Sequence, residues 1–374
     1  MNRPRFYFFI GTEAELIKLF PVLRSMQTRK IPFEIIASGQ NNLQKSVLFR
    51  ALGGIGVSLA LSDEATIRKS AAGLLKWFLQ TYSHAKKDIR RRFPGTVWTD
   101  CVMIVHGDTV STVMGALVAK RLKMKVAHIE AGLRSHNWLS PFPEEIDRVF
   151  TSRMADVHFA PGQDACRNLR SVKGLVVDTQ YNTILDSLRF SESVPCEHSG
   201  VAPLLDTDYF VFVLHRQENL AQKAFVRDLL SLIFELSKRV RCVMILHAPT
   251  KAAFAEMGLW DRVMDNPNVT VFPRVDYFDF MKLLMHSSFV ITDGGSNQEE
   301  LSYMGKPCYI LRRHTERTDG LGVNALLYDG DLASVARFAE DYDKYRTAPL
   351  RTDQSPSERI VVALLAYKTP GMQP

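Results

Sequence analysis

The sequence predicts an α/β protein made of two doubly wound domains with parallel sheets. Along most of the chain, short apolar runs typical of buried strands alternate with longer segments whose apolar residues recur at helical spacing. A polar stretch at residues 192–207 contains Ser, Pro and Gly and separates two such series, as an interdomain linker would. The length of 374 residues also suits two domains better than one core.

The first series predicts an N-terminal Rossmann-like domain over residues 1–190. Nearly continuous apolar runs indicate strands buried on both faces, at residues 6–10, 33–37, 101–105, 125–127, 157–160 and 175–177. Helices are expected at 14–28, after the second strand, and at 109–123, where apolar residues follow helical spacing. The run at 6–10 is too short for the apolar part of a signal peptide and is followed by Gly11-Thr12-Glu13, which favours a first strand.

The second series predicts another Rossmann-like domain over residues 207–352. Its strands are expected at 209–214, 242–246, 269–272, 289–291 and 308–311. Residues 353–374 form a closing segment, with a helix at 356–367 whose apolar stripe we expect to pack back on the N-terminal domain. Two such domains facing each other leave a cleft, which is a common place for a ligand.

The composition excludes several classes of protein. With 46% hydrophobic and 23% charged residues, and no apolar run near the ~20 needed to span a bilayer, a soluble globular protein is expected. The five cysteines are scattered without metal-ligand or CxxC spacing, which predicts reduced thiols, no metal site and a cytoplasmic location.

The net charge of +7 is partly local, because five basic residues crowd positions 86–92. They follow an apolar run at 74–79 and give an amphipathic helix with a basic end. One interpretation is a surface helix whose long side chains cover the core. The other is peripheral contact with an anionic membrane surface. Nucleic acid is not expected as a partner, since the run belongs to no recognisable binding module.

Ionisable residues gather after two successive strands of the first series. His106 and Asp108 follow the strand at 101–105, and His128 and Glu130 follow the next. The loop beyond adds Glu144 and its neighbour. Ligands bind beyond the carboxyl ends of strands in open parallel sheets, and carboxylates with histidines at such an edge indicate proton transfer.

The second domain offers two features that suit a phosphorylated ligand. Gly294, Gly295 and Ser296 join a strand to a helix, where backbone N–H groups and the helix dipole favour an anion, although glycines also serve such turns for positive φ alone. Glu300, one turn later, could accept from ribose hydroxyls. His215 and Arg216 end the first strand of this domain and could bind a pyrophosphate, or could simply be paired locally.

Taken together, these residues resemble the non-hydrolysing bacterial UDP-N-acetylglucosamine 2-epimerases, from Gly11 to about Leu321. The matching segments are Gly11-Thr12 with Glu15 and Lys18, His106-Gly107-Asp108-Thr109, 128–134, 140–145, Asn182-Thr183, His215-Arg216 with Glu218-Asn219, Asp293 with 298–300, 305–307 and 315–317. The resemblance implies a GT-B arrangement of two Rossmann-like domains, a homodimer, and an isomerase of cell-envelope polysaccharide biosynthesis. Its substrate would be a UDP-N-acetyl sugar, and no metal or nicotinamide cofactor is needed.

The implied reaction is elimination of UDP from UDP-GlcNAc across C1–C2, followed by re-addition to the glycal after the C2 proton returns on the other face. Asp108, Glu130 and Glu144 would carry the proton transfers, and His215 would assist the departing diphosphate. The residues expected to touch phosphate, sugar or ribose are Lys18, Arg134, Arg216, Gly294, Gly295, Ser296, Glu300 and Arg317.

The sequence departs from the family pattern at the phosphate side. Glu13 stands where the family has an arginine that reaches the diphosphate, and a like-charge contact would cost on the order of 1–4 kcal/mol at 4 Å. Either Glu13 points away, or the ligand differs. Asp-Ser-Gly-Gly is replaced by Asp293-Gly294-Gly295-Ser296, and Gln40-Asn41-Asn42 replaces the Gln-His-Arg of the family's regulatory site.

Two alternative activities follow from these departures. One is a GT-B glycosyltransferase that uses a UDP-N-acetyl sugar donor, which Glu13 and the basic helix favour. The other is a hydrolysing 2-epimerase that releases ManNAc and UDP. The three acid/base carboxylates are all present and favour the epimerase.

Overall fold

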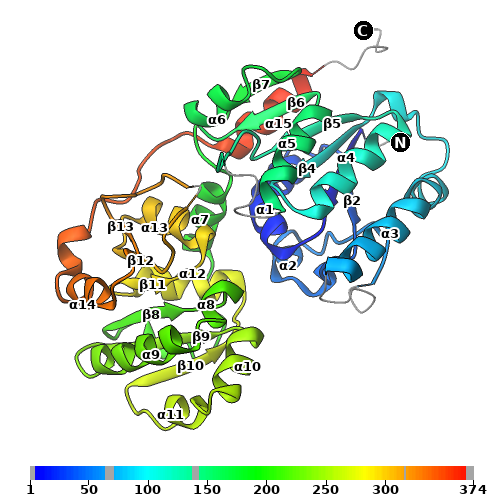
Figure 1. Ribbon diagram of the computed structural model, residues 1–374. Helices are drawn as coiled ribbons and strands as arrows, with labels where there is room; N and C mark the ends of the chain where they lie inside the picture. Colours follow the sequence, from blue (N-terminus) through cyan, green and yellow to red (C-terminus); the bar gives the residue numbers. More distant parts are fainter. Residues whose placement is uncertain (1–4, 64–70, 137–142, 316, 368–374) are drawn as a thin grey trace. The chain divides into compact units, whose positions relative to one another are not determined.

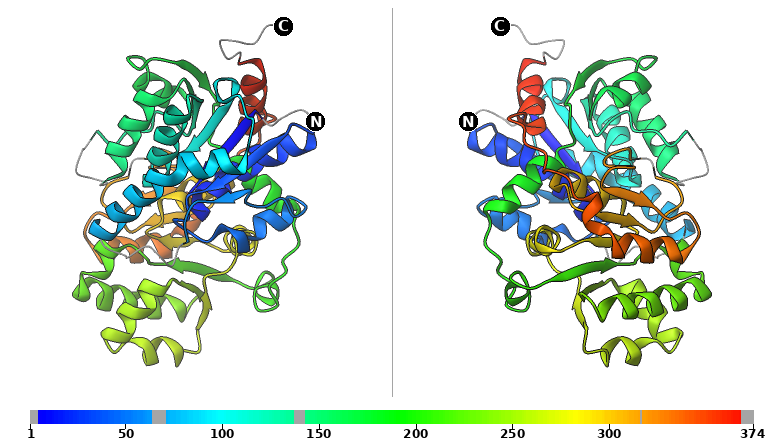
Figure 2. Two further views of the ribbon diagram at one scale, coloured as in Figure 1. Left: turned by 90° about the vertical axis from the view of Figure 1, so that its right-hand side faces the viewer. Right: turned by 90° about the vertical axis from the view of Figure 1, so that its left-hand side faces the viewer.

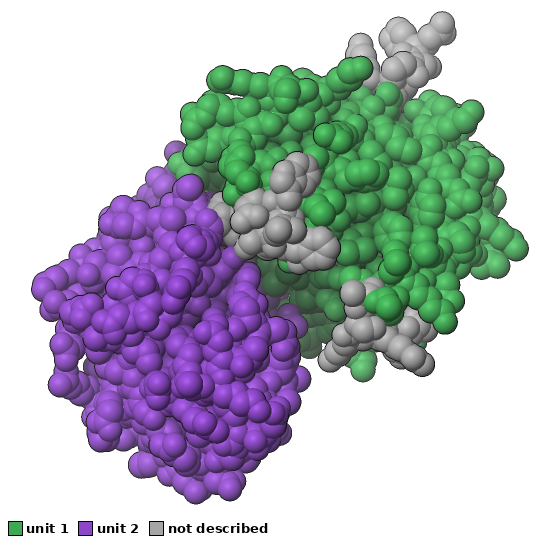
Figure 3. Space-filling model, in the orientation of Figure 1, with its two compact units in different colours: residues 1–187, 354–374 green, residues 188–353 purple. Residues whose placement is uncertain are grey.

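The computed structural model describes residues 5–63, 71–136, 143–315 and 317–367. The chain divides into two compact units, residues 1–187 with 354–374 and residues 188–353 (Figure 3). Each unit contains one parallel sheet with helices on both of its faces (Figures 1 and 2). The predicted α/β class with two doubly wound domains is therefore confirmed.

Unit 1 contains a seven-stranded sheet in the order β3-β2-β1-β4-β5-β6-β7. Its strands are β1 (Phe6–Ile10), β2 (Phe33–Ala37), β3 (Leu59–Ala60), β4 (Val102–His106), β5 (Lys125–Ile129), β6 (Val157–Ala160) and β7 (Leu175–Asp178). Its helices are α1 (Glu13–Thr28), α2 (Val47–Ala51), α3 (Ala71–Arg92), α4 (Val110–Leu122), α5 (Glu144–Met154), α6 (Gln163–Asn168) and α15 (Pro356–Ala366), and α7 (Ile184–Ser193) leads into unit 2.

Unit 2 contains a six-stranded sheet in the order β10-β9-β8-β11-β12-β13. Its strands are β8 (Tyr209–Val213), β9 (Arg241–Leu246), β10 (Val269–Pro273), β11 (Val290–Thr292), β12 (Cys308–Ile310) and β13 (Ala325–Leu327). Its helices are α8 (Gln217–Leu220), α9 (Lys223–Ser237), α10 (Ala248–Glu256), α11 (Trp260–Met264), α12 (Tyr277–His286), α13 (Gly295–Met304) and α14 (Leu332–Glu340).

The cores explain why the strands are apolar throughout. All five residues of β1 are buried, and so are all five of β4 and of β8. Tyr7 and Phe9 of β1 pack in one cluster with residues of α3 and α4, so their neighbours Phe6 and Phe8 face the opposite side of the sheet. Strands covered on both faces show no polar alternation, as expected for parallel sheets.

Helix α15 packs against α1 within unit 1. Ser25 of α1 donates to the Glu358 carboxylate at 2.6 Å, and Arg29 forms an ion pair with the same side chain. Ile360, Val361 and Leu364, from the predicted apolar stripe of this helix, are fully buried. The last described helix is thereby fixed to the first helix of the chain.

The strand order reverses once in each sheet, between β1 and β4 in unit 1 and between β8 and β11 in unit 2. Ligands of open parallel sheets bind at such switch points, beyond the carboxyl ends of the strands. In unit 1, Glu13 begins α1 directly after β1 and Asp108 follows β4, and in unit 2 His215 follows β8 and Asp293 follows β11. The register of β4 with β5, in which His106 is opposite Ile129, also brings Glu130 to this edge.

All five cysteines are free thiols. Within the described part of the chain, no helix combines the length and apolar character needed to cross a membrane.

Candidate active site

The first part of the candidate site is a buried cluster around Glu130, directly after β5. The Oε2 atom of Glu130 accepts hydrogen bonds from Lys18 Nζ of α1 and from Asn182 Nδ2, and His106 Nε2 lies 3.5 Å from it. Lys18, Asn182 and His106 are themselves buried. Glu130 adopts a left-handed backbone conformation with φ of 63°, which costs energy for a residue with a Cβ.

Asp108, two residues beyond β4, is held by an arginine from α5. Arg148 Nε and Nη2 lie 2.8 and 2.5 Å from Asp108 Oδ2, and Nη1 of the same guanidinium lies 3.3 Å from Glu145. Glu145 also accepts the backbone N–H of Ser135 at 2.9 Å and lies 4.0 Å from Arg134 Nε. Arg148 therefore ties the loop after β4 to the first turn of α5.

Glu144, the first residue of α5, lies next to this ion pair. Its Oε2 atom is buried and has no hydrogen-bond partner among the described residues. Asp147, one turn later, also has a buried oxygen, Oδ2, that lacks such a partner. Burial, and then the charges of Asp108 and Glu144, raise the pKa of Asp147 to about 7.

Two buried groups support the loop that carries Asp108. Glu15 accepts from the backbone N–H of Gly11 at 2.9 Å and from Thr109 Oγ1 at 2.6 Å, and burial raises its pKa to about 7. His128 donates from Nε2 to the Gly107 carbonyl at 2.8 Å. Burial lowers the pKa of His128 to about 4, so its ring is neutral at neutral pH.

Glu13, the residue that departs from the family pattern, has a partner in unit 1. Ser46 Oγ donates to its Oε1 atom at 2.6 Å, and its backbone N–H lies 3.4 Å from Asn41 Oδ1. The carboxylate also begins α1, where the helix dipole favours a negative charge. Local contacts thus account for an anion at this position.

The switch point of unit 2 is organised by Asp293, which is fully buried after β11. Its carboxylate accepts the backbone N–H groups of His215 and Arg216 at 3.0 and 2.9 Å and the Asn219 amide at 3.1 Å. His215 Nδ1 lies 3.0 Å from Oδ1. Burial alone would raise the pKa of Asp293, but His215 and the backbone donors outweigh it and lower the pKa, so the aspartate is ionised at neutral pH.

His215 is also positioned by a second ring. It stacks on His247, with ring centroids 4.8 Å apart and an angle of 24° between the planes. Burial, together with the neighbouring His215 and Arg274, lowers the pKa of His247 to about 4. His247 is therefore neutral at neutral pH and contributes a ring contact rather than a charge beside His215.

The amino end of α13 follows Asp293. Gly294 is its N-cap, has an ordinary φ of −81°, and provides no side chain to cap the helix. A Cβ at Gly294 would lie 2.5 Å from Asn297 Oδ1, so a larger residue here would require the Asn297 side chain to move. Gly295 opens the helix, and the side chain of Ser296 lies outside the described atoms. Such a helix end suits a phosphate.

Glu300 lies one turn further into α13 and is buried. Its Oε2 accepts from Asn297 Nδ2 at 3.1 Å. Burial, and then the Glu300 charge, raise the pKa of Tyr277 well above 10, which places the two side chains together. The carboxylate thus lies behind the same helix end that Gly294 and Gly295 form.

Comparison with known proteins identifies the family. A family model described as UDP-N-acetylglucosamine 2-epimerase matches residues 24–331. The UDP-N-acetylglucosamine 2-epimerase of Methanocaldococcus jannaschii is 30% identical over 334 residues, which cover 86% of this chain and 87% of the relative. The chain belongs to the UDP-N-acetylglucosamine 2-epimerase family.

The family resemblance predicted from the sequence motifs is therefore confirmed. The crystal structure of the M. jannaschii UDP-GlcNAc 2-epimerase in complex with UDP-GlcNAc and UDP matches with a TM-score of 0.80 at 27% identity, over 97% of this chain and 99% of that one. The UDP-2,3-diacetamido-2,3-dideoxy-D-glucuronate 2-epimerase of Pseudomonas aeruginosa is 33% identical over 219 residues, which cover 57% of this chain and 59% of the relative. The relatives of this chain thus include epimerases named for different UDP sugars.

Two arginines that the sequence analysis assigned to this epimerase-family site have protein partners. Arg216 pairs with Glu218 at 2.8 Å, which is the local pairing considered as the alternative. Arg317 is buried in an ion pair with Glu299 of α13. A second contact joins α13 to the Arg317 loop, because the Gln298 amide donates to the backbone carbonyl of Arg317 at 3.1 Å.

Arg148 and Asp147 were not among the predicted site residues, and the structure places them beside Asp108 and Glu144. A helical interpretation of residues 144–154 would have shown both within one turn of Glu144 and Glu145, at a spacing that puts side chains side by side. Asn182 was part of a matching motif, but its partner Glu130 could be found only in the folded chain.

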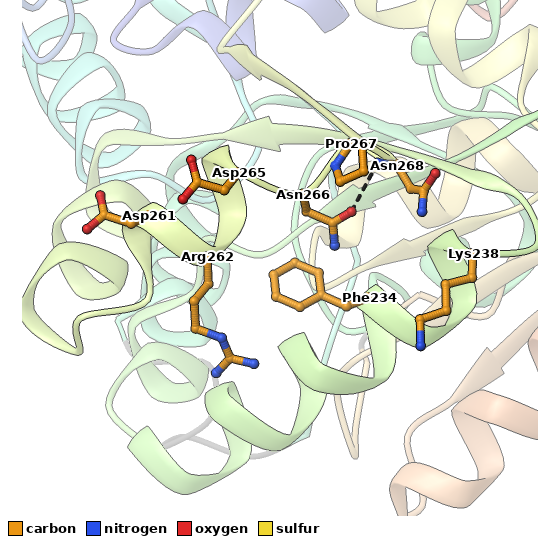
Figure 4. Close-up of a pocket in the computed structure, with 8 residues that line it drawn as sticks. All are labelled: Phe234, Lys238, Asp261, Arg262, Asp265, Asn266, Pro267 and Asn268. Carbon is orange, nitrogen blue, oxygen red and sulfur yellow. Dashed lines mark hydrogen bonds between the residues drawn. The ribbon is translucent and has the colours of Figure 1, made fainter.

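Two further observations on the described residues of this epimerase-family chain concern metal binding and a surface hollow. Among the described residues, no group of three or more His, Cys, Asp or Glu side chains could hold a metal ion. An open hollow of about 500 Å³ lies between α9, α11 and the turn before β10 (Figure 4). It is at the amino end of β10, whereas both switch points lie at carboxyl ends. Its lining residues are Phe234, Lys238, Asp261, Arg262, Asp265, Asn266, Pro267 and Asn268.

Proposed function

We propose that this chain epimerises a UDP-N-acetylhexosamine at C2, converting UDP-GlcNAc to UDP-ManNAc through a glycal intermediate. The observation that carries the proposal is the pair of carboxylates after β4 and β5. Asp108 and Glu130 lie at one sheet edge, and each is held by a buried cation, Arg148 or Lys18. Carboxylates fixed in this way can transfer protons without reorganising.

In the elimination step, a carboxylate of unit 1 takes the C2 proton. The electron pair of the C2–H bond forms the C1=C2 bond, and the pair of the C1–O bond leaves on the β-phosphate oxygen of UDP. In the return step, a carboxylic acid protonates C2 on the other face, and the same UDP oxygen attacks C1. We assign these proton transfers to Asp108, Glu130 and Glu144, with Arg134 near the sugar. No cofactor is required for either step.

Unit 2 is proposed to bind UDP. The uncapped amino end of α13, with Gly294, Gly295 and Ser296, would receive a phosphate. Glu300 would accept from the ribose hydroxyls. Protonated His215 has two N–H donors, so Nδ1 can bind Asp293 while Nε2 donates to the departing diphosphate oxygen.

For the two basic residues with protein partners, we propose different roles. Arg216 is half-buried at the end of β8, and its partner Glu218 is mostly exposed, so a diphosphate can replace that partner at small cost. Arg317 is proposed to fix the loop after β12 to α13 through its ion pair with Glu299. In this role Arg317 supports the UDP site without contacting UDP.

The glycosyltransferase alternative was suggested chiefly by Glu13. Since Ser46 binds the Glu13 carboxylate, an anion at this position does not require a different ligand. The hydrolysing alternative uses the same carboxylates and differs in whether UDP or water captures C1. One experiment separates the three activities: incubation with UDP-GlcNAc in D2O, followed by NMR of the products.

The epimerase predicts deuterium at C2 of UDP-linked sugars and the appearance of UDP-ManNAc. Free ManNAc with stoichiometric UDP would instead support the hydrolase. Binding of UDP-GlcNAc without any exchange at C2 would contradict both epimerases and leave the transferase. Replacing UDP-GlcNAc by its 2,3-diacetamido uronate counterpart tests the sugar preference directly.

We also propose a homodimer that works in the cytoplasm in cell-envelope polysaccharide biosynthesis. The free thiols suit a reducing compartment, and α5 exposes Ile146 and Phe150, four residues apart on one helix face. A dimer should give a mass near twice 42.4 kDa by light scattering. The Phe150→Asp variant should be monomeric if α5 forms the interface, and an unchanged mass would exclude this surface.

Peripheral membrane contact is proposed for α3. This helix exposes Leu75 and Leu79, and helical spacing puts the exposed Arg90 of its last turns on the same face. Lys87 and Arg91 are exposed beside that face. Such a face suits an anionic bilayer. Cosedimentation with phosphatidylglycerol vesicles should exceed that with phosphatidylcholine vesicles and fall in a Leu75→Gln, Leu79→Gln variant. Equal binding to both vesicles would exclude the contact.

A further inference from the structure

The carboxylate of Glu130 is bound by donors from two distant segments of unit 1. Its Oε2 atom accepts from Lys18 of α1 and from Asn182, which lies just before α7. All three side chains are buried. Lys18 supplies a positive charge on a long, flexible stem with three rotatable donors, whereas Asn182 supplies a planar amide on a short side chain. Asn182 is therefore the donor suited to fix the direction of the carboxylate.

The other end of the Asn182 amide is fixed by the start of α7. Asn182 Oδ1 accepts the backbone N–H of Ile184, the first residue of this helix, at 3.3 Å, and the hydroxyl of Thr183 at 3.4 Å. An amide oxygen only accepts and an amide nitrogen only donates. Since the oxygen faces two donors, the nitrogen faces Glu130. Rotating the amide would set donor against donor at one end and acceptor against carboxylate at the other.

The first turns of α7 are anchored to two other helices of unit 1. Ser187 Oγ donates to the Ile17 carbonyl of α1 at 2.7 Å. Asp186 Oδ2 accepts from Ser355 Oγ, the N-cap of α15, at 2.8 Å. Asn182 thus projects from a helix end whose position is fixed by packed neighbours, which is the support that a precisely oriented site residue requires.

We propose that Asn182 is a positioning residue for the reaction, and that its amide N–H fixes the direction in which Glu130 presents its carboxylate to the sugar. This inference rests on the proposed epimerisation. Asn182 acts through Glu130 and transfers no proton itself. A carboxylate held in one direction can transfer a proton without reorganising, and a misplacement of about 1 Å can cost about 100-fold in rate.

Two substitutions separate this role from a purely structural one. Asn182→Asp has the same shape and keeps an oxygen for the N–H of Ile184, but it places a second carboxyl group against Glu130. Asn182→Ser also keeps an oxygen that can accept an N–H two residues later, and it only removes a donor from Glu130. If the bond to α7 were all that mattered, the aspartate variant would retain more activity than the serine variant.

The measurement is kcat and KM for deuterium exchange at C2 of UDP-GlcNAc at neutral pH. Asn182→Ser should lower kcat about tenfold, since a hydrogen bond to a charged group is lost. Asn182→Asp should lower kcat by about 10²–10⁴-fold, because two adjacent carboxyl groups repel each other or hold a proton between them, and Glu130 is then lost as a base. KM should change less than about threefold in both variants.

Asn266→Asp in unit 2 is the matched control. Asn266 Oδ1 accepts the N–H of Asn268, also two residues later, at 3.0 Å, and this substitution should leave exchange unchanged. More exchange in Asn182→Asp than in Asn182→Ser would overturn the proposal, and so would a raised KM with an unchanged kcat. Absence of C2 exchange in the wild type would instead refute the proposed function, so the two failures are distinguishable.

A stability measurement tests the contact without turnover. The urea midpoint should fall in Asn182→Asp, because two buried carboxyl groups then face each other. Adding Glu130→Gln should restore most of the midpoint, since the glutamine amide can donate to the new carboxyl group in an exchange of the two roles. Additive effects of the two substitutions on the free energy of unfolding would show that the side chains do not interact, and would overturn the proposal.

Discussion

Replacing Lys18 by methionine should remove the cation that neutralises Glu130 while keeping most of the length of the side chain. The side chains of this pair are only 7% and 4% exposed, so water cannot replace the lost ammonium group. Removing one partner of a buried ion pair costs about 3–5 kcal/mol, because the other charge stays buried and uncompensated. Asn182 still donates to Glu130 in this variant, which favours the lower end of that range.

The double variant Lys18→Met, Glu130→Gln should recover most of the lost stability, since a neutral amide needs no cation and its oxygen can accept from Asn182. Urea denaturation of the wild type, both single variants and the double variant gives the coupling free energy directly. We expect about 2 kcal/mol or more of coupling, because the two charges are desolvated together.

The exposed pair of Lys120 and Asp156 provides the matched control. Lys120 is 41% exposed, and Lys120→Met should cost less than about 1 kcal/mol. If Lys18→Met cost no more than this control, or if the two substitutions of the double variant were additive, Lys18 would not neutralise Glu130.

Substitutions at three other positions test single contacts. Glu13→Gln should change the KM for UDP-GlcNAc less than about threefold because Ser46 already binds the carboxylate, whereas a fall of about tenfold would place Glu13 against the diphosphate. The pKa of His128 is about 4 in the fold and 6.5 in the unfolded chain, so its contribution to stability is complete above pH 6.5 and falls by about 3 kcal/mol on acidification to pH 4. His128→Gln should lose this part of the pH dependence in urea titrations, and an unchanged slope would contradict the assignment. Arg317→Met should lower the free energy of unfolding by about 3–5 kcal/mol, because Glu299 stays buried, while calorimetry should show a Kd for UDP within about tenfold of the wild type. A larger loss of affinity in a stable variant would make Arg317 a direct ligand.

The strands could be predicted closely from the sequence because parallel strands buried on both faces are continuously apolar. Residues 6–10, 33–37 and 157–160 are strands with the predicted bounds. The predicted helix at 14–28 begins one residue earlier, where Thr12 caps it by accepting the N–H of Glu15. The polar side chains at the ends of β4 and β5 also follow from the pattern, since parallel strands end at one edge.

The partners of those side chains could not be predicted, because they come from distant elements. Asp108 and Arg148 are 40 residues apart, and Glu130 and Asn182 are 52 apart. Contacts between residues this far apart in the sequence cannot be inferred from the spacing of residues within one strand or helix. A sequence pattern predicts that a carboxylate lies at the sheet edge. Only the folded structure shows which side chain donates to that carboxylate.

Glycine and arginine motifs were ambiguous for the same reason. Gly294 suggested either an anion site or a turn with positive φ, and the structure shows an ordinary φ with the Asn297 side chain packed 2.5 Å from the place of a Cβ. Arg317 suggested a phosphate ligand, and the structure pairs it with Glu299, which lies 18 residues earlier in the chain. In both cases a neighbour brought close by folding, rather than the residue itself, decides the geometry.

Carboxylates of unit 1 are proposed to move the C2 proton of a UDP-N-acetyl sugar. The rate of deuterium incorporation at C2 of UDP-GlcNAc in D2O, measured in the wild type and in Glu130→Gln and Asp108→Asn, tests this role. We expect exchange by the wild type and a loss of about 10²–10⁴-fold in each variant, with UDP-GlcNAc still bound. Full exchange by either variant, or none by a wild-type protein that binds UDP-GlcNAc, would rule the role out.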